Sequence, residues 1–118
     1  MIGKIVAVPF PFTDLTGAKV RPALVIYEGH DDVIVAFISS KMPTVHHNED
    51  VPLARQMPTF KRSGLKRDSV IKLNKLATLD KSLIEGEFGE IDHDLLGEVQ
   101  KRLKDMFGPR DILSLRSR

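Results

Sequence analysis

The sequence predicts a mainly β domain with helices, built as a small β-barrel or a strongly curled sheet with one helix packed on it. Two observations carry this prediction. Before residue 92 the chain contains four to six short apolar segments separated by Gly, Pro and polar residues. After residue 92, the apolar residues of one segment repeat with the period of a helix. Closure into a barrel is favoured because it removes the exposed edges of so many short strands.

The first predicted strand is residues 5–8, which read Ile-Val-Ala-Val. It is followed by Pro-Phe-Pro-Phe at residues 9–12. Because proline has no N–H to donate to a sheet ladder, the chain must leave the sheet there or run along its edge. Residues 13–17 are Thr-Asp-Leu-Thr-Gly, a composition that predicts a loop.

The second and third predicted strands are residues 22–27 and 33–38. Both are uninterrupted apolar segments, which is typical of strands buried on both faces. The polar residues 28–32 lie between them. This order predicts a hairpin.

Residues 39–58 have no clear period and contain three prolines, so we expect a long loop with a brief strand around Val51 and Leu53. A loop of this length in a compact domain is typically functional or mobile. Residues 69–73 predict a further strand, and residues 75–79 either continue it or turn out of it.

Over residues 83–91 the pattern is mixed, since Phe88 and Ile91 favour a strand and Gly86 and Gly89 interrupt it.

Residues 92–107 give the clearest helix. Its apolar positions follow the helical period on a single stripe, and they are Leu95, Leu96, Val99, Leu103, Met106 and Phe107. We expect the whole stripe, including its last two members, to be core. Asp92 or Asp94 can cap the start, and the Gly-Pro pair at 108–109 ends the helix. We expect the tail at 110–118 to be frayed.

Length and composition limit the class of protein. The chain has 118 residues, 42% hydrophobic and 29% charged, which predicts one globular domain over 1–118 and excludes a disordered chain, a collagen or a coiled coil. It has no cysteine, which excludes disulfide scaffolds, thiolate metal sites and cysteine nucleophiles. The N-terminus has no signal-peptide pattern, and no apolar run approaches the ~20 residues of a membrane span. We expect a soluble cytoplasmic protein that does not bind a membrane.

Charge is distributed unevenly along the chain. The formal net charge is only +2, but residues 55–81 contain eight Lys or Arg and two Asp. Residues 85–94 contain five Asp or Glu and no Lys or Arg. Such asymmetry can attract a polyanion to one face of the molecule. A lysine-rich solvated surface is the alternative.

Known catalytic motifs are absent from the sequence: there is no GxxxxGK[ST], GxGxxG, HExxH or GxSxG segment. The adjacent His46 and His47 have no obvious third ligand, so we expect no metal and no cofactor. Arg21 directly precedes one strand of the predicted hairpin and Ser39 directly follows the other, which brings them together at its open end. A guanidinium beside a hydroxyl could hold a phosphodiester. Alternatively, Arg21 forms a salt bridge at the rim and Ser39 caps a turn.

Three segments resemble, in order, the MazF/PemK family of toxin endoribonucleases. Residues 9–26, Pro-Phe-Pro-Phe-Thr-Asp-Leu-Thr-Gly-Ala-Lys-Val-Arg-Pro-Ala-Leu-Val-Ile, resemble its first signature, and the Arg-Pro-Ala-Leu-Val core is the most specific part. Residues 36–40, Ala-Phe-Ile-Ser-Ser, are similar to the segment that carries the catalytic hydroxyl. Residues 64–71 and 77–81 match the central strand and the approach to the late elements. The resemblance covers residues 3–107.

This resemblance implies an SH3-like β-barrel with a C-terminal amphipathic helix, a homodimer, and metal-independent cleavage of single-stranded RNA at specific sequences. It also implies a cognate antitoxin that neutralises the toxin. Arg21 matches the catalytic arginine, and Ser39 matches the catalytic hydroxyl. Lys72 and Asn74 stand where some members carry an arginine and an aspartate. The general base is therefore not identified by the resemblance, and Asp14 is our candidate, with a solvated loop carboxylate as the alternative.

We expect RNA contacts from Phe12, Thr13, Lys19, Ser40, Lys41, Lys72 and Asn74. Phe10 and Phe12 could stack on RNA bases, or could make core or dimer contacts. Cleavage would yield a 2′,3′-cyclic phosphate and a 5′-OH. The main alternative is a non-catalytic module that binds nucleic acid or a peptide on the same barrel. A structural subunit without a ligand is the third possibility.

Overall fold

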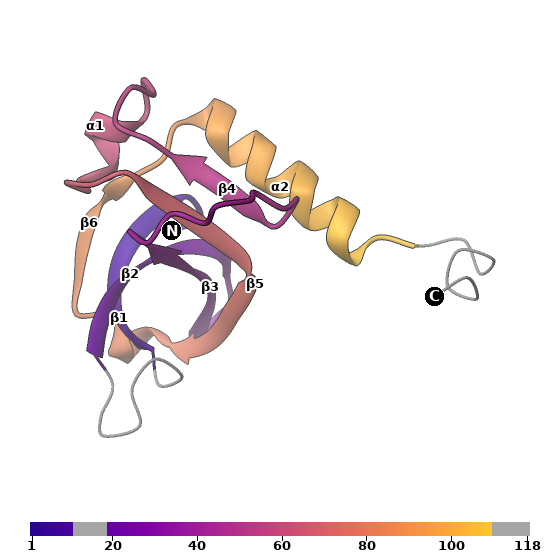
Figure 1. Cartoon of the computed structure of the whole chain (residues 1–118). Helices are drawn as coiled ribbons and strands as arrows, with labels where there is room; N and C mark the ends of the chain where they lie inside the picture. Colours follow the sequence, from indigo (N-terminus) through magenta and orange to yellow (C-terminus); the bar gives the residue numbers. More distant parts are fainter. Residues whose placement is uncertain (11–18, 110–118) are drawn as a thin grey trace.

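The computed structural model describes residues 1–10 and 19–109 (Figure 1). Its elements are, in order, β1 (Lys4–Phe10), β2 (Lys19–Glu28), β3 (Asp32–Ser39), β4 (Asp50–Leu53), α1 (Phe60–Ser63), β5 (Ser69–Asp80), the 3-10 helix η2 (Lys81–Leu83), β6 (Gly86–Glu90) and α2 (His93–Phe107). All strand pairs are antiparallel, in the order β4-β5-β3-β2-β1-β6. The sheet curls into a half-barrel with α2 beside it (Figure 1). The predicted mainly β barrel with a C-terminal helix is confirmed.

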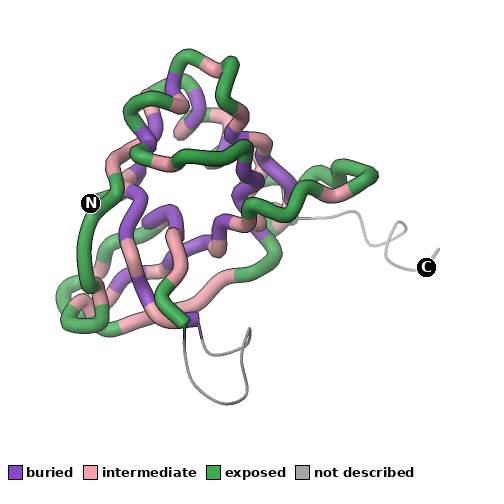
Figure 2. Tube along the Cα trace, turned by 60° about the vertical axis from the view of Figure 1, so that its left-hand side comes forward, coloured by how far each residue is buried: buried purple, intermediate pink, exposed green. Residues whose placement is uncertain are grey.

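Both faces of the central strands are buried. Alternate residues join two different clusters: Ile5 and Leu24 pack with Leu95 and Val99 of α2, whereas Val6, Ala23, Val25 and Val35 form a second cluster. Because side chains alternate across a sheet, the two clusters lie on its two faces. Figure 2 shows buried positions along the strands and exposed positions in the turns between them. Burial on both faces explains why the sequences of β2 and β3 are continuously apolar.

The β2–β3 hairpin forms as predicted, and each strand is longer than its apolar segment. Gly29 N donates to Asp32 O at 2.8 Å in the turn. β1 also runs two residues further than predicted, through Pro9 and Phe10, which pair with β2. Pairing of β1 with β6 ends at Ala7. Pro9 therefore lies where β1 is an edge of the sheet, one of the two expected outcomes.

β5 continues through to Asp80 rather than turning out of the sheet. Its pairing with β3 is interrupted, because Ala36 pairs with Leu76 while the next residue, Phe37, pairs with Lys72. The extra residues on β5 form a bulge, which bends a strand and increases its twist. The brief strand predicted around Val51 and Leu53 is β4.

α1 is not predicted by the sequence analysis, and two glycines allow it to lie against β6. Gly64, at the C-cap of α1, has φ 75°, and a Cβ there would stand 2.0 Å from Phe88 O. A Cβ on Gly89 would stand 2.1 Å from Arg62 O. The backbone after α1 and the backbone of β6 therefore approach more closely than any side chain allows. This close approach accounts for the glycine within the strand pattern.

α2 begins with Asp92 as its N-cap, whose side chain accepts a hydrogen bond from Leu95 N at 2.9 Å. Met106 packs against the core, but Phe107 is 69% exposed. The prediction that Phe107 is core is wrong because α2 extends beyond the edge of the sheet (Figure 1). The predicted frayed tail lies outside the described residues. Of the helices described at 1–10 and 19–109, none has the length and apolar character needed to span a membrane.

Candidate functional site

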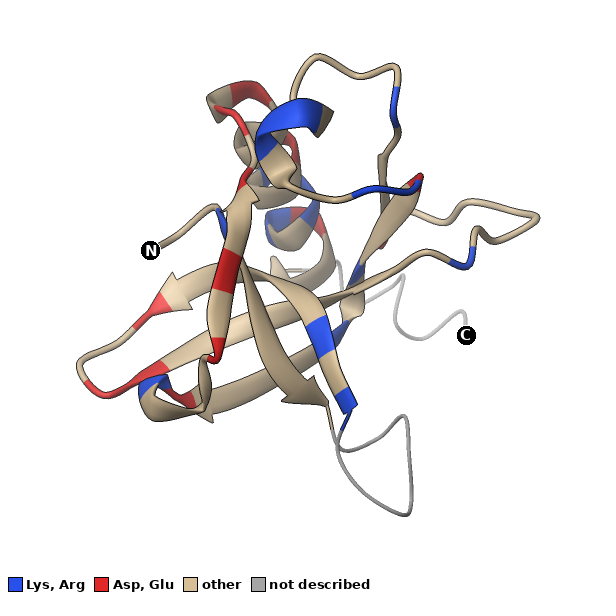
Figure 3. Cartoon of the chain, turned by 90° about the vertical axis from the view of Figure 1, so that its left-hand side faces the viewer, with Lys and Arg blue, Asp and Glu red and all other residues tan. Residues whose placement is uncertain are grey.

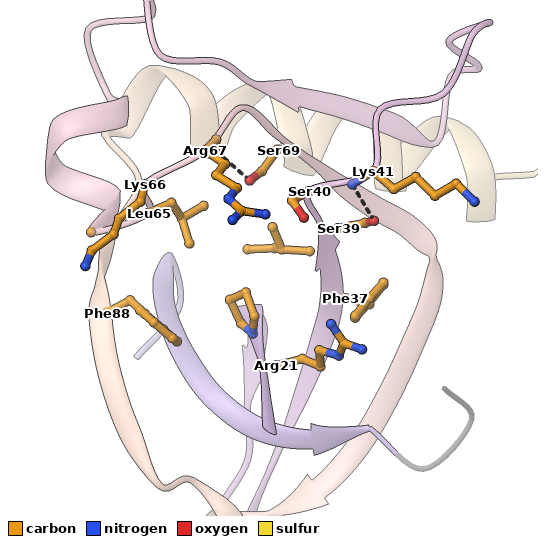
Figure 4. A pocket seen from close by; sticks show the side chains of 13 residues that line it. Arg21, Phe37, Ser39, Ser40, Lys41, Leu65, Lys66, Arg67, Ser69 and Phe88 are labelled. Atoms are coloured by element: carbon orange, nitrogen blue, oxygen red, sulfur yellow. Dashed lines mark hydrogen bonds between the residues drawn. The ribbon is translucent and has the colours of Figure 1, made fainter. Parts of the chain in front are cut away.

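A pocket of about 570 Å³ opens at the end of the β2–β3 hairpin (Figure 4). Its walls come from β2, from β3 and the turn after it, from the segment between α1 and β5, and from β6. The lining residues are Arg21, Pro22, Phe37, Ile38, Ser39, Ser40, Lys41, Gly64, Leu65, Lys66, Arg67, Ser69 and Phe88.

Arg21 and Ser39 reach this pocket through the hairpin register. Ala23 pairs with Phe37, and the same antiparallel register continued outward by two residues brings Arg21 opposite Ser39. Both side chains line the pocket. The arginine before one strand and the serine at the end of the next therefore share one site.

Arg21 has a donor without a partner. Its Nε is buried and forms no hydrogen bond with the described residues, nor does Arg21 form an ion pair with any of them. A buried polar group left without a partner costs about 1–3 kcal/mol. An oxyanion in the pocket would satisfy this donor, and guanidinium matches the geometry of a phosphate.

Ser39 is held in place by a local hydrogen bond. Its Oγ accepts from Lys41 N at 3.1 Å (dashed in Figure 4), so it does cap a turn, as the alternative interpretation held. A serine hydroxyl has one proton to donate and two lone pairs. The backbone N–H occupies one lone pair and leaves the proton for a ligand.

Among the described residues of the lining, every charged side chain is cationic. They are Arg21, Lys41, Lys66 and Arg67. In Figure 4, Arg67 extends into the pocket from the side opposite Arg21, whereas Lys41 and Lys66 extend away from it. Figure 3 shows acidic residues along β6 and at the closed end of the β2–β3 hairpin, away from the basic residues of β2. A site of one sign of charge concentrates anions.

The other residues predicted to contact RNA are spread over different surfaces. Ser40 and Lys41 line the pocket. Lys19 is exposed at the start of β2, and Asn74 is exposed in the β5 bulge. Phe12, Thr13 and the candidate base Asp14 lie outside the described residues. Phe10 is fully buried and packs edge-to-face on Phe37, with ring centroids 5.2 Å apart, so it is a core residue.

Lys72 forms an ion pair with Asp50 and does not line the pocket. Its Nζ lies 2.5 Å from Asp50 Oδ1, and the Asp50 side chain is 1% exposed. His47 N donates to Asp50 Oδ2 at 3.0 Å, and Arg102 donates to Asp50 O at 2.8 Å. Burial would raise the pKa of Asp50, but the hydrogen bonds from Lys72 and His47 outweigh burial, so its pKa is lowered. This ion pair joins the first residue of β4 to its register partner on β5, and the bond from His47 N ties in the loop before β4.

Four prominent lining residues are not candidates from the sequence: Phe37, Leu65, Arg67 and Phe88. Two sequence signals include Arg67: the basic segment 55–81 and the segment 64–71 that resembles the toxin family. The two phenylalanines carry no sequence feature that separates them from core aromatics. Only the close packing of α1 on β6 brings Leu65 and Phe88 to the same site as Arg21.

The fold and the pocket define a class of protein: a small curled antiparallel sheet with a C-terminal helix and a cationic pocket at the open end of its central hairpin. A family model described as "PemK-like, MazF-like toxin of type II toxin-antitoxin system" matches residues 2–107. The chain belongs to this toxin family.

Solved structures with the same fold include other toxins of this kind. Mycobacterium tuberculosis toxin MazF-mt6 aligns with a TM-score of 0.69 and 16% identity, over 92% of this chain and 99% of that chain. A mycobacterial endoribonuclease in complex with its cognate antitoxin has a TM-score of 0.68 and 14% identity, over 94% and 98%. MazE-MazF from Deinococcus radiodurans has a TM-score of 0.65 and 20% identity, over 92% and 94%. Comparison with curated protein sequences gives no match.

Proposed function

We propose that this toxin is an endoribonuclease that cuts single-stranded RNA at specific short sequences without a metal ion. The observation that carries the proposal is the pocket shared by Arg21 and Ser39, in which the buried Arg21 Nε has no partner among the described residues. The similar mycobacterial structure titled an endoribonuclease supports the same activity.

In the proposed reaction, the 2′-oxygen attacks the adjacent phosphorus and the bond from phosphorus to the 5′-oxygen breaks. The products are a 2′,3′-cyclic phosphate and a 5′-OH. Arg21 stabilises the negative charge that develops on the phosphorane oxygens, and the Ser39 hydroxyl donates a hydrogen bond to one of these oxygens. A base must remove the 2′-OH proton, and the departing 5′-oxygen must take up one proton, which comes from solvent and is replaced by the proton on the base. Asp14 is our candidate, because the described lining has no carboxylate or imidazole.

The lining chemistry supports the metal-independent form of this proposal. Common protein ligands for catalytic metals are carboxylates, imidazoles and thiolates. The described part of the lining offers guanidinium, ammonium and hydroxyl groups instead. Cations there take over the role that a metal ion has in other nucleases, which is to neutralise phosphate charge.

The direct test is cleavage of a randomised single-stranded RNA pool in EDTA. We expect discrete fragments with 5′-OH and 2′,3′-cyclic ends. Arg21→Ala and Ser39→Ala should lower the rate, by about 10²–10³ for the arginine as for other groups that stabilise a transition-state oxyanion. Arg55→Ala is the matched control, because Arg55 is exposed and does not line the pocket. No cleavage by folded wild-type protein would contradict the proposal.

We also propose a homodimer in the cytoplasm that is neutralised by a cognate antitoxin. The similar structures solved with an antitoxin, or as MazE-MazF, support the antitoxin. Light scattering after gel filtration tests the dimer. Loss of RNA cleavage on addition of the antitoxin tests the partner.

The second candidate function is a binding module without turnover. The observation that favours it is the lack of a carboxylate or imidazole in the described pocket lining. It predicts tight, salt-sensitive binding to RNA that stays intact. The pool experiment separates the two functions, because only the endoribonuclease generates new 5′ ends.

A further inference from the structure

One side of the pocket is apolar and carries an exposed aromatic ring. Phe88 of β6 is 44% exposed, and Leu65 lies beside it after α1. In Figure 4 these two side chains face the pocket on one side, and Arg21 and Phe37 lie on the other. Phe88 belongs to neither core cluster. An exposed ring at a concave site is typical of ligand contact.

This apolar wall is built rigidly. The Gly64 and Gly89 positions leave no room for a Cβ between the backbone after α1 and the backbone of β6. Lys4 bonds Glu90 at 3.1 Å, and Arg62 bonds the same carboxylate at 2.9 Å. The backbone that carries Phe88 is therefore fixed against the segment after α1 before any ligand arrives, which reduces the entropy lost on binding.

Cationic groups flank the apolar wall. Arg67 extends into the pocket beside Leu65, and Arg21 lies across from it (Figure 4). A ligand that fits has a flat apolar face between two anionic groups. A nucleotide within an RNA strand has this form, with a base that stacks on aromatic rings and a phosphate on each side. The volume of about 570 Å³ lies within the usual range for small-molecule sites, roughly 300–1,000 Å³.

We propose that Phe88 and Leu65 form a nucleobase subsite next to the cleavage site. The base of a nucleotide flanking the cut stacks on Phe88, and its outer phosphate binds Arg67. This inference rests on the proposed endoribonuclease function and adds to it the wall that binds one base of the target RNA.

The test uses the sequence that the wild type cuts in the RNA pool, synthesised with a 2′-deoxy nucleotide at the cut so that it binds without reacting. Phe88→Ala should weaken binding by about 5- to 150-fold, the range for one base stacked on an aromatic ring. Phe88→Tyr should restore it. Tyr27→Ala is the matched control, because Tyr27 is an aromatic residue, 51% exposed, outside the pocket.

An abasic probe identifies the base. Removing the stacked base should weaken binding to the wild type and should not weaken binding to Phe88→Ala any further, because the two changes delete the same contact. The subsite is overturned if the losses of affinity from base removal and from Phe88→Ala add at every position of the probe, or if Phe88→Ala and wild type bind with equal affinity. In either case the proposed function still holds when the wild type cleaves RNA and Arg21→Ala does not. If the wild type cuts nothing, the proposed function fails instead. A randomised single-stranded DNA pool then tests the subsite: weaker binding by Phe88→Ala but not Tyr27→Ala supports it, and equal binding overturns it.

Discussion

At the scale of single residues, Arg21 is placed for function at the expense of stability. Its buried Nε has no partner among the described residues, a situation that costs free energy in the unliganded protein. Arg21→Met keeps most of the apolar stem and removes the unsatisfied donor. We expect this variant to lose cleavage and to unfold at the same temperature as the wild type or a higher one. Thermal unfolding followed by circular dichroism measures this, and a clear drop in melting temperature would argue that Arg21 has a structural partner.

Lys72, in contrast to Arg21, stabilises the fold, because it pairs with the buried carboxylate of Asp50. The lowered pKa of Asp50 means that the ion pair stabilises the fold above the unfolded pKa of about 3.9, and that this contribution is lost as the pH falls through the folded pKa. Lys72→Met should lower the free energy of unfolding at pH 7 by about 3 kcal/mol, the low end for breaking a buried pair because the Lys72 side chain is 20% exposed.

Without the lysine, burial opposes ionisation of Asp50 and raises its pKa, so the difference between Lys72→Met and wild type should begin to shrink above pH 4 and should continue to shrink as the pH falls towards the lowered pKa of the wild-type carboxyl. Urea unfolding at several pH values measures the difference. Lys75→Met, at an exposed position on the same strand, is the control. Equal stability of Lys72→Met and wild type at pH 7 would show that the ion pair does not stabilise the fold, and Lys72 would then be free to bind RNA.

At the scale of elements, the contact of α1 with β6 depends on glycine. Gly89→Ala places a Cβ 2.1 Å from Arg62 O, so one of the two backbones must move. We expect a loss of more than 1 kcal/mol in the free energy of unfolding. Gly97→Ala is the matched control, since nothing lies within 4 Å of a Cβ there. In the middle of α2 this change should stabilise the fold by about 0.5–1 kcal/mol. Chemical denaturation compares the two, and similar values would contradict the close packing.

The elements that the sequence predicts are those with a strong local signal. The apolar runs of β2 and β3 and the helical stripe of α2 follow from burial alone. The helix α1 has no such signal, because its four residues are too few to show a periodic apolar pattern. It is held by its packing on β6. Phe107 continues the stripe in sequence, but α2 passes the end of the sheet and leaves it exposed. Whether α1 forms, and whether Phe107 is buried, depends on how long each element is and on where the neighbouring elements lie. A local sequence pattern contains neither piece of information.

At the scale of the whole molecule, half of the pocket is predictable. Arg21, Ser39, Ser40 and Lys41 belong to one hairpin and the turn after it, so their proximity follows from the pairing of two adjacent strands. Arg67 and Phe88 reach the same pocket only through the curl of the sheet, which brings β6 and the segment after α1 to the end of that hairpin. Contacts between segments so distant in sequence need the complete fold.

At the scale of the whole molecule, the placement of basic residues should set how strongly RNA binding depends on salt. If Arg67 binds an RNA phosphate in the pocket and Lys66 binds one beside its rim, the variant that lacks both releases fewer counterions on binding. For Lys66→Ala/Arg67→Ala, the slope of log affinity against log salt should become shallower by about 1.4, at about 0.7 per phosphate on a single strand. Lys101→Ala/Lys104→Ala removes the same charge from exposed positions on α2 and should leave the slope unchanged. Fluorescence anisotropy of an uncleavable single-stranded probe, from low to high salt, measures both. Equal slopes for the two variants would mean that net charge, and not the pocket, attracts the RNA.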